Sequence, residues 1–312
     1  MSSRLDNLRI IDPVLTGLAQ GYENSTLIYK NLFPVVEVSK QKGKIPKFGK
    51  VAFVSYDTLR SIRTKSNRLL PNDIQLINFS TQERDIEVAI DYLEEEEALT
   101  NLKYEKRLTK QLKDILELGK ELEAAQLAQN TQNYPSGMTR TLLTNETLNN
   151  PSSTTNPIEL IQEGKDAIRN KIALYPNTMI IGNSAYNTLI NHSKVLERIK
   201  FNGIQKINTE ILSELFEIPN VYVGMGITSD DGINFSDIWQ DNIILAYVDN
   251  STKDERTEYN PSFGYTFQRK GMPETDTYYE NGGKIKVIRC TDNYGIIITA
   301  PDAGYLIKNI NQ

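Results

Sequence analysis

DYLEEEEALTNLKYEKRLTKQLKDILELGKELEAAQLAQN, residues 91 to 130, contains no proline and a single glycine, Gly119, and predicts one long helix. Asp91 and Glu94, three residues apart, fit a capping box at the start of this helix. Negative charge follows where the helix dipole is positive, because four glutamates are consecutive: Glu94, Glu95, Glu96 and Glu97. Such a helix is a rod of roughly 45–50 Å, longer than an ordinary small domain is wide. We therefore expect a spine that crosses the molecule, not a core helix.

One narrow apolar stripe runs along the predicted helix. Its residues recur at spacings of four, three and seven: Leu108, Leu112, Ile115 and Leu122, with Leu116 and Ala125 alongside. The other faces carry lysine and glutamate, so we expect only this side to be buried. We predict that the stripe packs against a β-sheet formed partly by residues 284–310. A coiled coil is the alternative, and it ranks second because the repeat lapses at Gly119 after about two heptads.

The composition is that of an ordinary soluble protein with one large or two smaller domains: 312 residues, 39% apolar and 24% charged. No apolar run is long enough to span a membrane, and the N-terminus is charged where a signal peptide would be apolar. Cys290 is the only cysteine and His192 the only histidine, which excludes an intrachain disulfide and a cysteine/histidine metal site and favours a reducing cytoplasm. A net charge of −5 argues against wholesale coating of nucleic acid.

Two segments before the helix cannot form cores of their own. Residues 1–33 predict an extended arm with a short helix, which must lie on its own chain or a neighbour's or remain disordered, and we favour the neighbour. Residues 40–68 carry nine lysines and arginines against one acid, Asp57. Three stretches in and after this segment are rich in β-forming residues: 51–56, 74–79 and 86–90. They predict a long hairpin that projects and is stabilised by a partner, with a solvated basic loop as the alternative.

The sequence offers no set of residues for catalysis. His192 lies in a polar junction between helices, where a cap or surface role is favoured over catalysis. Gly224 and Gly226 match only part of a dinucleotide fingerprint. An aspartate-rich loop lacks the ligand spacing of a calcium motif and is better read as a solvated acidic loop: Asp230, Asp231, Asp237 and Asp241. We expect no enzyme activity, no catalytic residue, no cofactor and no bound metal.

Several short motifs carry a family resemblance. In chain order they are LFPVVEV at 32–38, GKIPKFG at 43–49, the helix exit at 121–134, NPI at 156–158 and PNTMIIG at 176–182. In this order and spacing they resemble the major capsid proteins of tailed double-stranded DNA bacteriophages with the Hong Kong 97-like fold. The resemblance covers nearly the whole chain and implies an α+β fold in four parts: an N-terminal arm at 1–33, a strand and extended loop at 34–90, a peripheral domain with spine helix and β-sheet at 91–141 plus 255–312, and an axial domain at 142–254.

The resemblance also implies a function, that of a major head protein which self-assembles as hexamers and pentamers into an icosahedral shell around a double-stranded DNA genome. Its place would be the virion, after assembly in the host cytoplasm. The implied partners are further copies of the chain, packaged DNA bound without sequence preference, a portal protein and a decoration protein, and no membrane. Some relatives carry a built-in scaffold before the arm, whereas here the arm begins almost at once, so we expect a separate scaffolding protein. An encapsulin-type compartment shell, a phage tail or baseplate protein and a cytoplasmic enzyme stay open as alternatives.

We predict that the basic hairpin clasps the adjacent subunit. Its cations are Arg60, Arg63, Lys65 and Arg68. The candidate acids lie at the spine start and before the last strands: Glu94, Glu95, Glu96, Glu97, Asp254, Glu255 and Glu258. An exposed ion pair contributes only about 0–1 kcal/mol, so such a clasp acts through several contacts that repeat at every interface.

Overall fold

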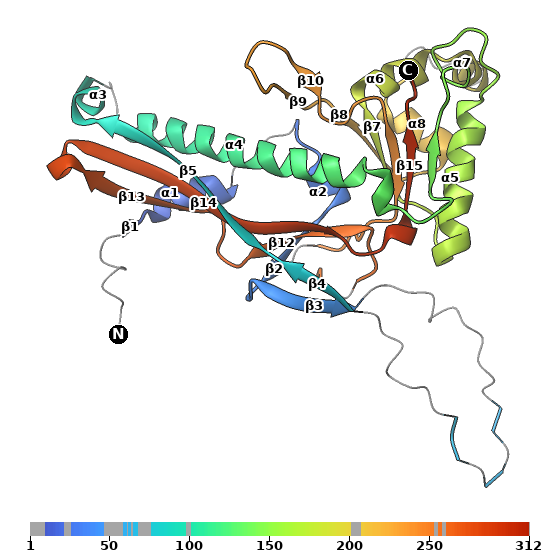
Figure 1. Ribbon diagram of the computed structural model, residues 1–312, viewed down its shortest axis with the longest axis horizontal. Helices are drawn as coiled ribbons and strands as arrows, with labels where there is room; N and C mark the ends of the chain where they lie inside the picture. The colour runs from blue at the N-terminus through green and yellow to red at the C-terminus, as the bar shows by residue number, and fades with distance from the viewer. Residues whose placement is uncertain are drawn as a thin grey trace.

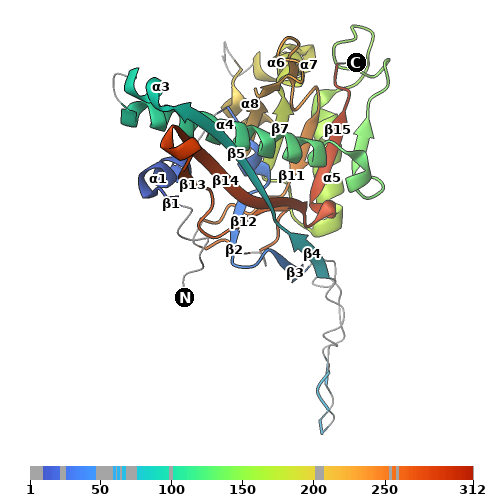
Figure 2. The ribbon, with the colours of Figure 1, turned by 60° about the vertical axis from the view of Figure 1, so that its left-hand side comes forward.

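A long helix and two β-sheets make up the body of the molecule, which the computed structural model in Figure 1 shows with two projections on opposite sides. The residues that the structure describes are 10–21, 26–46, 59–60, 62–63, 65–67, 76–97, 101–200, 207–252, 255–257 and 260–311. The first sheet runs along the long helix, and the second stands across one end of it (Figures 1 and 2).

The first sheet is built around its longest strand, β14 (Ile285–Ile298). β13 (Glu274–Glu280) pairs antiparallel with the first half of β14, and β12 (Gly264–Arg269) pairs with its second half. β5 (Gln82–Asp91) pairs antiparallel with β14 on the opposite edge from β13. Two short strands complete the six-stranded sheet: β1 (Ile10–Ile11) beside β13, and β2 (Val35–Val38) parallel to β12.

The second sheet has five strands, in the order β6 (Thr139–Thr141), β15 (Gly304–Lys308), β11 (Ile243–Ala246), β7 (Thr178–Gly182) and β8 (Asn220–Gly224). The helices of this layer are α5 (Pro157–Ile172), α6 (Asn183–Asn191), α7 (Ser193–Lys200) and α8 (Thr209–Phe216). The interior strand β7 is buried along its whole length. Asn156 starts α5 by accepting a hydrogen bond from the amide of Ile158 at 3.1 Å, and proline fills the first turn.

The last strand corrects one prediction. Residues 284–310 do not lie in one sheet, because the chain turns at Pro301–Ala303 and β15 pairs with β11 in the second sheet. Only β14 from this range lies in the first sheet. An apolar strand of this kind is compatible with either sheet, so its pairing could not be read from its own residues.

The spine is described as two helices, α3 (Tyr92–Glu97) and α4 (Asn101–Ala128), with residues 98–100 outside the described part. Asp91 Oδ1 accepts a hydrogen bond from the amide of Leu93 at 3.0 Å, and Glu94 Oε2 accepts one from the amide of Asp91 at 3.3 Å. The reciprocal bonds of the predicted capping box are therefore present. α4 runs along the first sheet and reaches the second sheet at its C-terminal end (Figure 1).

The N-terminal arm lies on its own chain wherever it is described. β1 extends the first sheet through β13, and α1 (Pro13–Gly21) packs between α4 and β13. Leu15 and Ala19 of α1 are fully buried there. The short helix α2 (Tyr29–Leu32) also packs against α4. Our preference for a neighbouring chain is therefore wrong for residues 10–21 and 26–33. The apolar face of α1 packs against α4 and β13 of its own subunit.

The projecting segment begins as a true hairpin, formed by β3 (Lys42–Pro46) and β4 (Leu76–Ser80) in antiparallel pairing. The predicted strand at 51–56 lies outside the described residues. We predicted that residues 86–90 join the hairpin, and this is wrong. They belong to β5 and pair with β14. A second, smaller hairpin of β9 (Ile227–Thr228) and β10 (Ser236–Asp237) projects on the opposite side of the body (Figure 1).

Candidate assembly surfaces

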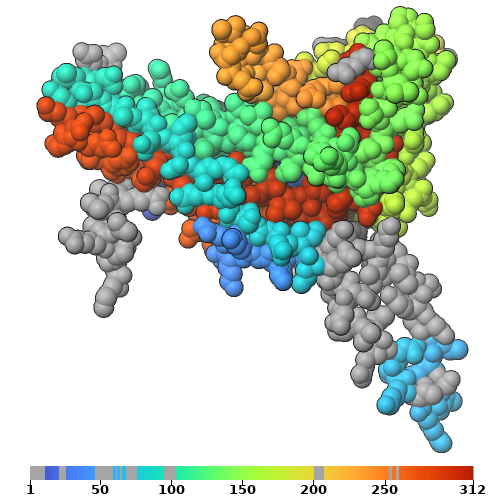
Figure 3. Space-filling model, in the orientation of Figure 1, coloured from blue at the N-terminus to red at the C-terminus, as the bar shows by residue number. Residues whose placement is uncertain are grey.

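The basic residues of the extended loop stand away from the body. Arg60, Arg63 and Lys65 are exposed, and Arg68 lies outside the described residues. Figure 3 shows the described tip, in bright blue, at the far end of the projection from β3 and β4. The acidic helix α3 lies at the opposite end of the molecule (Figure 1). A contact between this tip and α3 therefore requires two copies of the chain.

The acidic start of the spine is only partly described. Glu94 is exposed, and the side chains of Glu95, Glu96 and Glu97 lie outside the described part. Two exposed apolar side chains, Tyr92 and Leu93, accompany Glu94. The described part of this surface is thus both acidic and apolar.

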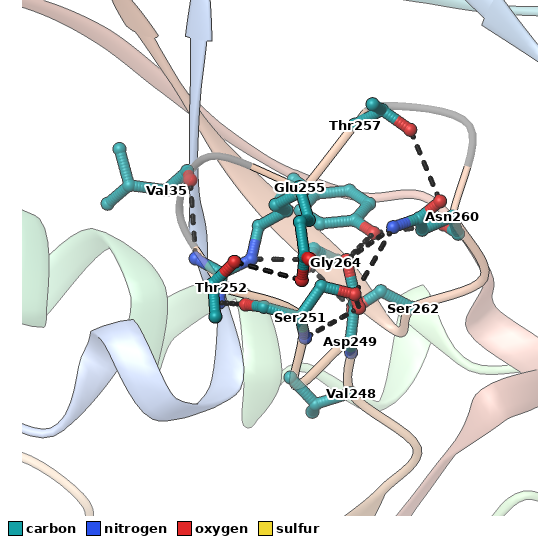
Figure 4. A network of polar contacts seen from close by, with 12 residues as sticks. Val35, Val248, Asp249, Ser251, Thr252, Glu255, Thr257, Asn260, Ser262 and Gly264 are labelled. Atoms are coloured by element: carbon teal, nitrogen blue, oxygen red, sulfur yellow. Dashed lines mark hydrogen bonds and ion pairs between the residues drawn. The ribbon is translucent and has the colours of Figure 1, made fainter.

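The second acidic group lies in the turn between the two sheets, which Figure 4 shows from close by. Asp249 Oδ1 accepts a hydrogen bond from the amide of Ser251 at 3.0 Å, and Asp249 Oδ2 accepts one from Asn260 Nδ2 at 3.0 Å. Glu255 Oε2 accepts a hydrogen bond from Thr252 Oγ1 at 3.0 Å, which fixes it within the turn. Asp254 and Glu258 lie outside the described residues. A role of these acids at an interface stays a prediction.

The apolar seam under the spine differs by one residue from the predicted stripe. Leu108 and Leu112 lie in a buried cluster with Leu116, Ile90 of β5 and Ile288 of β14. Ile115 is 45% exposed, so its predicted place in the seam is wrong and Leu116 occupies it. Positions 115 and 116 both continue the stripe from residue 112, at spacings of three and four, and only the packing decides between them.

The remaining predicted seam residue lies further along α4. Leu122 is half-buried and packs against the cluster around the second sheet. The spine thus shares its apolar side between the two sheets, because α4 runs past the end of the first cluster.

We predict that Leu112→Asp prevents soluble folding and that Ile115→Asp, one turn along the helix, is tolerated. Aspartate at position 112 would place a carboxylate among buried side chains, which costs several kcal/mol. Aspartate at position 115 would place the carboxylate at the surface. Soluble yield and thermal unfolding of the two variants would check this. Equal behaviour of the two variants would contradict the packing of the seam.

A cluster of buried charges lies on α4 at the middle of the molecule. Glu117 Oε1 lies 2.7 Å from Lys113 Nζ and 2.9 Å from Lys120 Nζ. Lys120 Nζ also lies 2.6 Å from Asp292 Oδ2 of β14. Tyr29 of α2 donates a hydrogen bond from its hydroxyl to Glu117 Oε2 at 2.8 Å. The cluster therefore joins the arm, the spine and the central strand of the first sheet.

The pKa values in this cluster follow from burial and charge together. Burial alone would raise the pKa of Glu117, but Lys120 and Lys113 hold it well below its usual range. Burial would lower the pKa of Lys120, but Asp292 and Glu117 raise it above its usual value. Burial, together with nearby Lys120, lowers the pKa of Lys113. Opposite charges at close range keep Glu117 and Lys120 ionised although both side chains are buried.

One turn beyond this cluster, Glu121 ties three segments together. Its carboxylate accepts hydrogen bonds from the amides of Ile28 and Tyr29 at 3.0 and 2.8 Å, and from the indole N–H of Trp239. Burial raises the pKa of Glu121. Trp239 follows β10 and is fully buried. The arm and the second layer are thus positioned by one side chain of the spine.

A known family matches most of this chain. The model of phage major capsid protein E matches residues 25–273. The chain belongs to this phage capsid protein family. The major capsid protein of Burkholderia phage BcepMu is 44% identical to it over 309 residues, with 99% of each chain covered. As a major capsid protein, the chain is a component of the phage virion and assembles with copies of itself.

Solved structures confirm the predicted fold of the capsid protein. A phage-related protein from Bordetella bronchiseptica RB50 is 28% identical, with a TM-score of 0.81 and 97% and 98% of the two chains covered. The capsid structure of Cyanophage P-SCSP1u is 14% identical, with a TM-score of 0.55 and 92% and 90% covered. The Hong Kong 97-like α+β fold that the motifs predict is therefore correct.

The side chains that the sequence analysis considered for catalysis and metal binding have structural roles in the capsid protein. His192 Nδ1 accepts a hydrogen bond from the amide of Lys194 at 3.3 Å, which confirms its predicted capping role. The carboxylate of Asp231 accepts bonds from the amides of Ile233 and Asn234 and closes the turn of the β9–β10 hairpin. Among the described residues, no three histidine, cysteine, aspartate or glutamate side chains converge as metal ligands. Within the same part of the chain, no helix has the length and apolarity that membrane crossing needs.

The burial of three charged residues of α4 was not predicted from the sequence. Lys113, Glu117 and Lys120 recur at spacings of four and three, as exposed ion pairs on a helix do, and they were expected on the solvated faces. Their burial depends on Tyr29 and Asp292, which lie far away in the sequence. Position alone gave no signal for it.

Proposed function

We propose that this capsid protein assembles as hexamers and pentamers into an icosahedral shell that encloses a double-stranded DNA phage genome. Assembly takes place in the host cytoplasm, with a portal protein, a separate scaffolding protein and a decoration protein as further partners. The observation that carries the proposal is the placement of the basic loop tip and the acidic helix α3 at opposite ends of one subunit (Figure 1). Surfaces of this kind join copies head to tail, and such contacts close into rings when the rotation between copies permits.

In this proposal the subunit has two domains, one around each sheet. The spine and the first sheet form the peripheral domain, and the layer around the second sheet forms the axial domain near the hexamer and pentamer axes. β6 pairs with β15, and β15 pairs with β11, which supports assigning residues 139–141 and 304–308 to the axial domain and shifts the boundaries of the sequence-based division.

The loop acts as a clasp between subunits. Arg60, Arg63, Lys65 and Arg68 bind carboxylates of the adjacent copy. The candidates at the spine start and the turn between the sheets remain those of the sequence: Glu94, Glu95, Glu96, Glu97, Asp254, Glu255 and Glu258. Each exposed pair contributes about 0–1 kcal/mol, so the clasp depends on the sum of many pairs across the shell.

The test is electron microscopy of the purified protein, combined with an assay for nuclease-protected DNA in any particles. Closed isometric shells from phage-infected cells that protect double-stranded DNA support the proposal. Shells that never contain a genome would favour an encapsulin-type compartment. A protein that forms only tubes, rings or monomers would overturn the shell.

We predict that the free subunit binds DNA weakly and without sequence preference. The net charge is −5, so the few lysines and arginines that face DNA must act against a negative protein. Fluorescence anisotropy with two unrelated duplexes should give the same affinity, and this affinity should fall as the salt concentration rises. Tight binding to one duplex alone would contradict the prediction.

A further inference from the structure

The β9–β10 hairpin has large apolar side chains on the face that points away from the body. Ile227 pairs with Asp237, and Thr228 pairs with Ser236. Side chains alternate between the two faces of a hairpin, so residues of one parity share a face. On one face Gly226 and Ile238 are buried against the body. Ile227 lies on the other face, and three more exposed apolar side chains lie in the segments next to the two strands: Met225, Ile233 and Phe235.

Ile233 is 79% exposed and Phe235 is 63% exposed in the subunit. A two-stranded hairpin is marginal by itself, and exposed apolar side chains that gather in one place indicate an interaction surface. The outer face of this hairpin therefore needs a partner.

The charges around this face are negative. Asp230 is exposed in the turn, and Asp237 lies beside Ile227. The tip of the extended loop also combines exposed apolar side chains with charged neighbours, but its charges are positive. Ile62 is 91% exposed and Leu59 is also exposed, and they are accompanied by three cations: Arg60, Arg63 and Lys65. An apolar patch with an acidic margin thus matches an apolar tip with a basic margin.

The two surfaces cannot meet within one chain. Figures 1 and 3 show the hairpin and the loop tip on opposite sides of the body. Each copy can therefore offer its tip to one neighbour and its hairpin to another. This arrangement is heterologous, and it generates rings when it closes.

We infer that the β9–β10 hairpin of one capsid subunit receives the loop tip of the next copy, with Leu59 and Ile62 against Ile233 and Phe235. The basic residues of the tip face Asp230. The inference rests on the proposed shell assembly and names a receiving surface for the loop.

Disulfide trapping in assembled particles tests the contact. The native Cys290 is buried, so it does not compete for oxidation. Particles of Ile62→Cys with Phe235→Cys, treated with a mild oxidant, should give a ladder of covalent oligomers on a non-reducing gel. The matched pair, Ile62→Cys with Leu143→Cys, should stay monomeric on the gel, since Leu143 is also exposed but belongs to neither surface.

The outcomes separate this inference from the proposed function. Normal shells without a ladder from the hairpin pair, or with equal ladders from the hairpin pair and the Leu143 pair, would overturn the hairpin contact and leave the shell intact. A wild-type protein that forms no shells would overturn the proposed function itself. If the wild type forms no shells and the oxidised subunit with Ile62→Cys and Phe235→Cys also gives no ladder, the hairpin contact is contradicted as well.

A second measurement does not depend on introduced cysteines. The double variant Ile233→Ser with Phe235→Ser removes exposed side chains, so circular dichroism should be unchanged while shell yield falls by about tenfold or more, since loss of buried apolar contact weakens each interface. Leu143→Ser, at another exposed leucine, is the control and should assemble normally. Normal shells from the double variant would contradict the inference.

Discussion

Glu117→Gln will lower the free energy of unfolding of the capsid subunit by about 3–5 kcal/mol, as expected when one member of a buried ion cluster loses its charge. Glutamine has nearly the same size, so the change is in charge and not in packing. Lys113 would lose its carboxylate partner at 2.7 Å, and Lys120 would retain only Asp292. Urea unfolding of the dissociated subunit measures the loss.

The matched control is Glu123→Gln on the same helix. Glu123 Oε2 lies 2.8 Å from Arg84 Nη2, but both side chains are partly exposed. Such a pair contributes about 0–1 kcal/mol, so this variant should unfold nearly as the wild type does. Equal losses in the two variants would show that the cluster on α4 is not set apart by its burial.

The same carboxylate gives the stability a pH dependence with a defined sign. The folded pKa of Glu117 lies below its unfolded value, so the folded state holds fewer protons on this group. Its contribution is complete above the unfolded pKa and is lost as the pH falls through the folded pKa. Acidification should therefore destabilise the wild type more than Glu117→Gln.

Reversing Arg60, Arg63 and Arg68 to glutamate together will abolish shell assembly and leave the subunit folded. The described members, Arg60 and Arg63, are exposed at the loop tip, so no core is disturbed. Like charges would then meet across every interface, and the cost repeats with each copy. Circular dichroism reports the fold, and sedimentation reports the assembly.

The control keeps the charge at all three positions by changing the same arginines to lysine. This variant should still assemble, with weaker contacts where an arginine binds a carboxylate through two nitrogens. Normal shells from the glutamate variant would mean that these side chains only face solvent, and the clasp would be wrong.

The sequence was sufficient for the elements whose signals are local. The capping box of Asp91 and Glu94, the proline and asparagine at the start of α5, and the apolar spacing of Leu108 and Leu112 each depend on nearby residues. The order of these elements along the chain then identified the fold. Local chemistry was enough because each signal acts within one or two helical turns.

The features that could not be predicted depend on distant segments. Leu116 replaces Ile115 in the seam because β5 and β14 pack against the face of α4 that carries Leu116. The charges of Glu117 and Lys120 are buried because the arm and β14 close over them. β15 leaves the first sheet because β11 offers it an edge. Periodicity shows which residues share a face of an element, but not which other element covers that face.

The most direct measurement is a cryo-electron microscopy reconstruction of purified particles of the wild-type capsid protein. We predict a closed icosahedral shell in which the loop tip of every subunit, including Arg60 and Ile62, lies against an adjacent copy. A closed shell whose loops fold back on their own subunits would contradict the clasp. Particles without icosahedral symmetry would contradict the proposed assembly into an icosahedral shell.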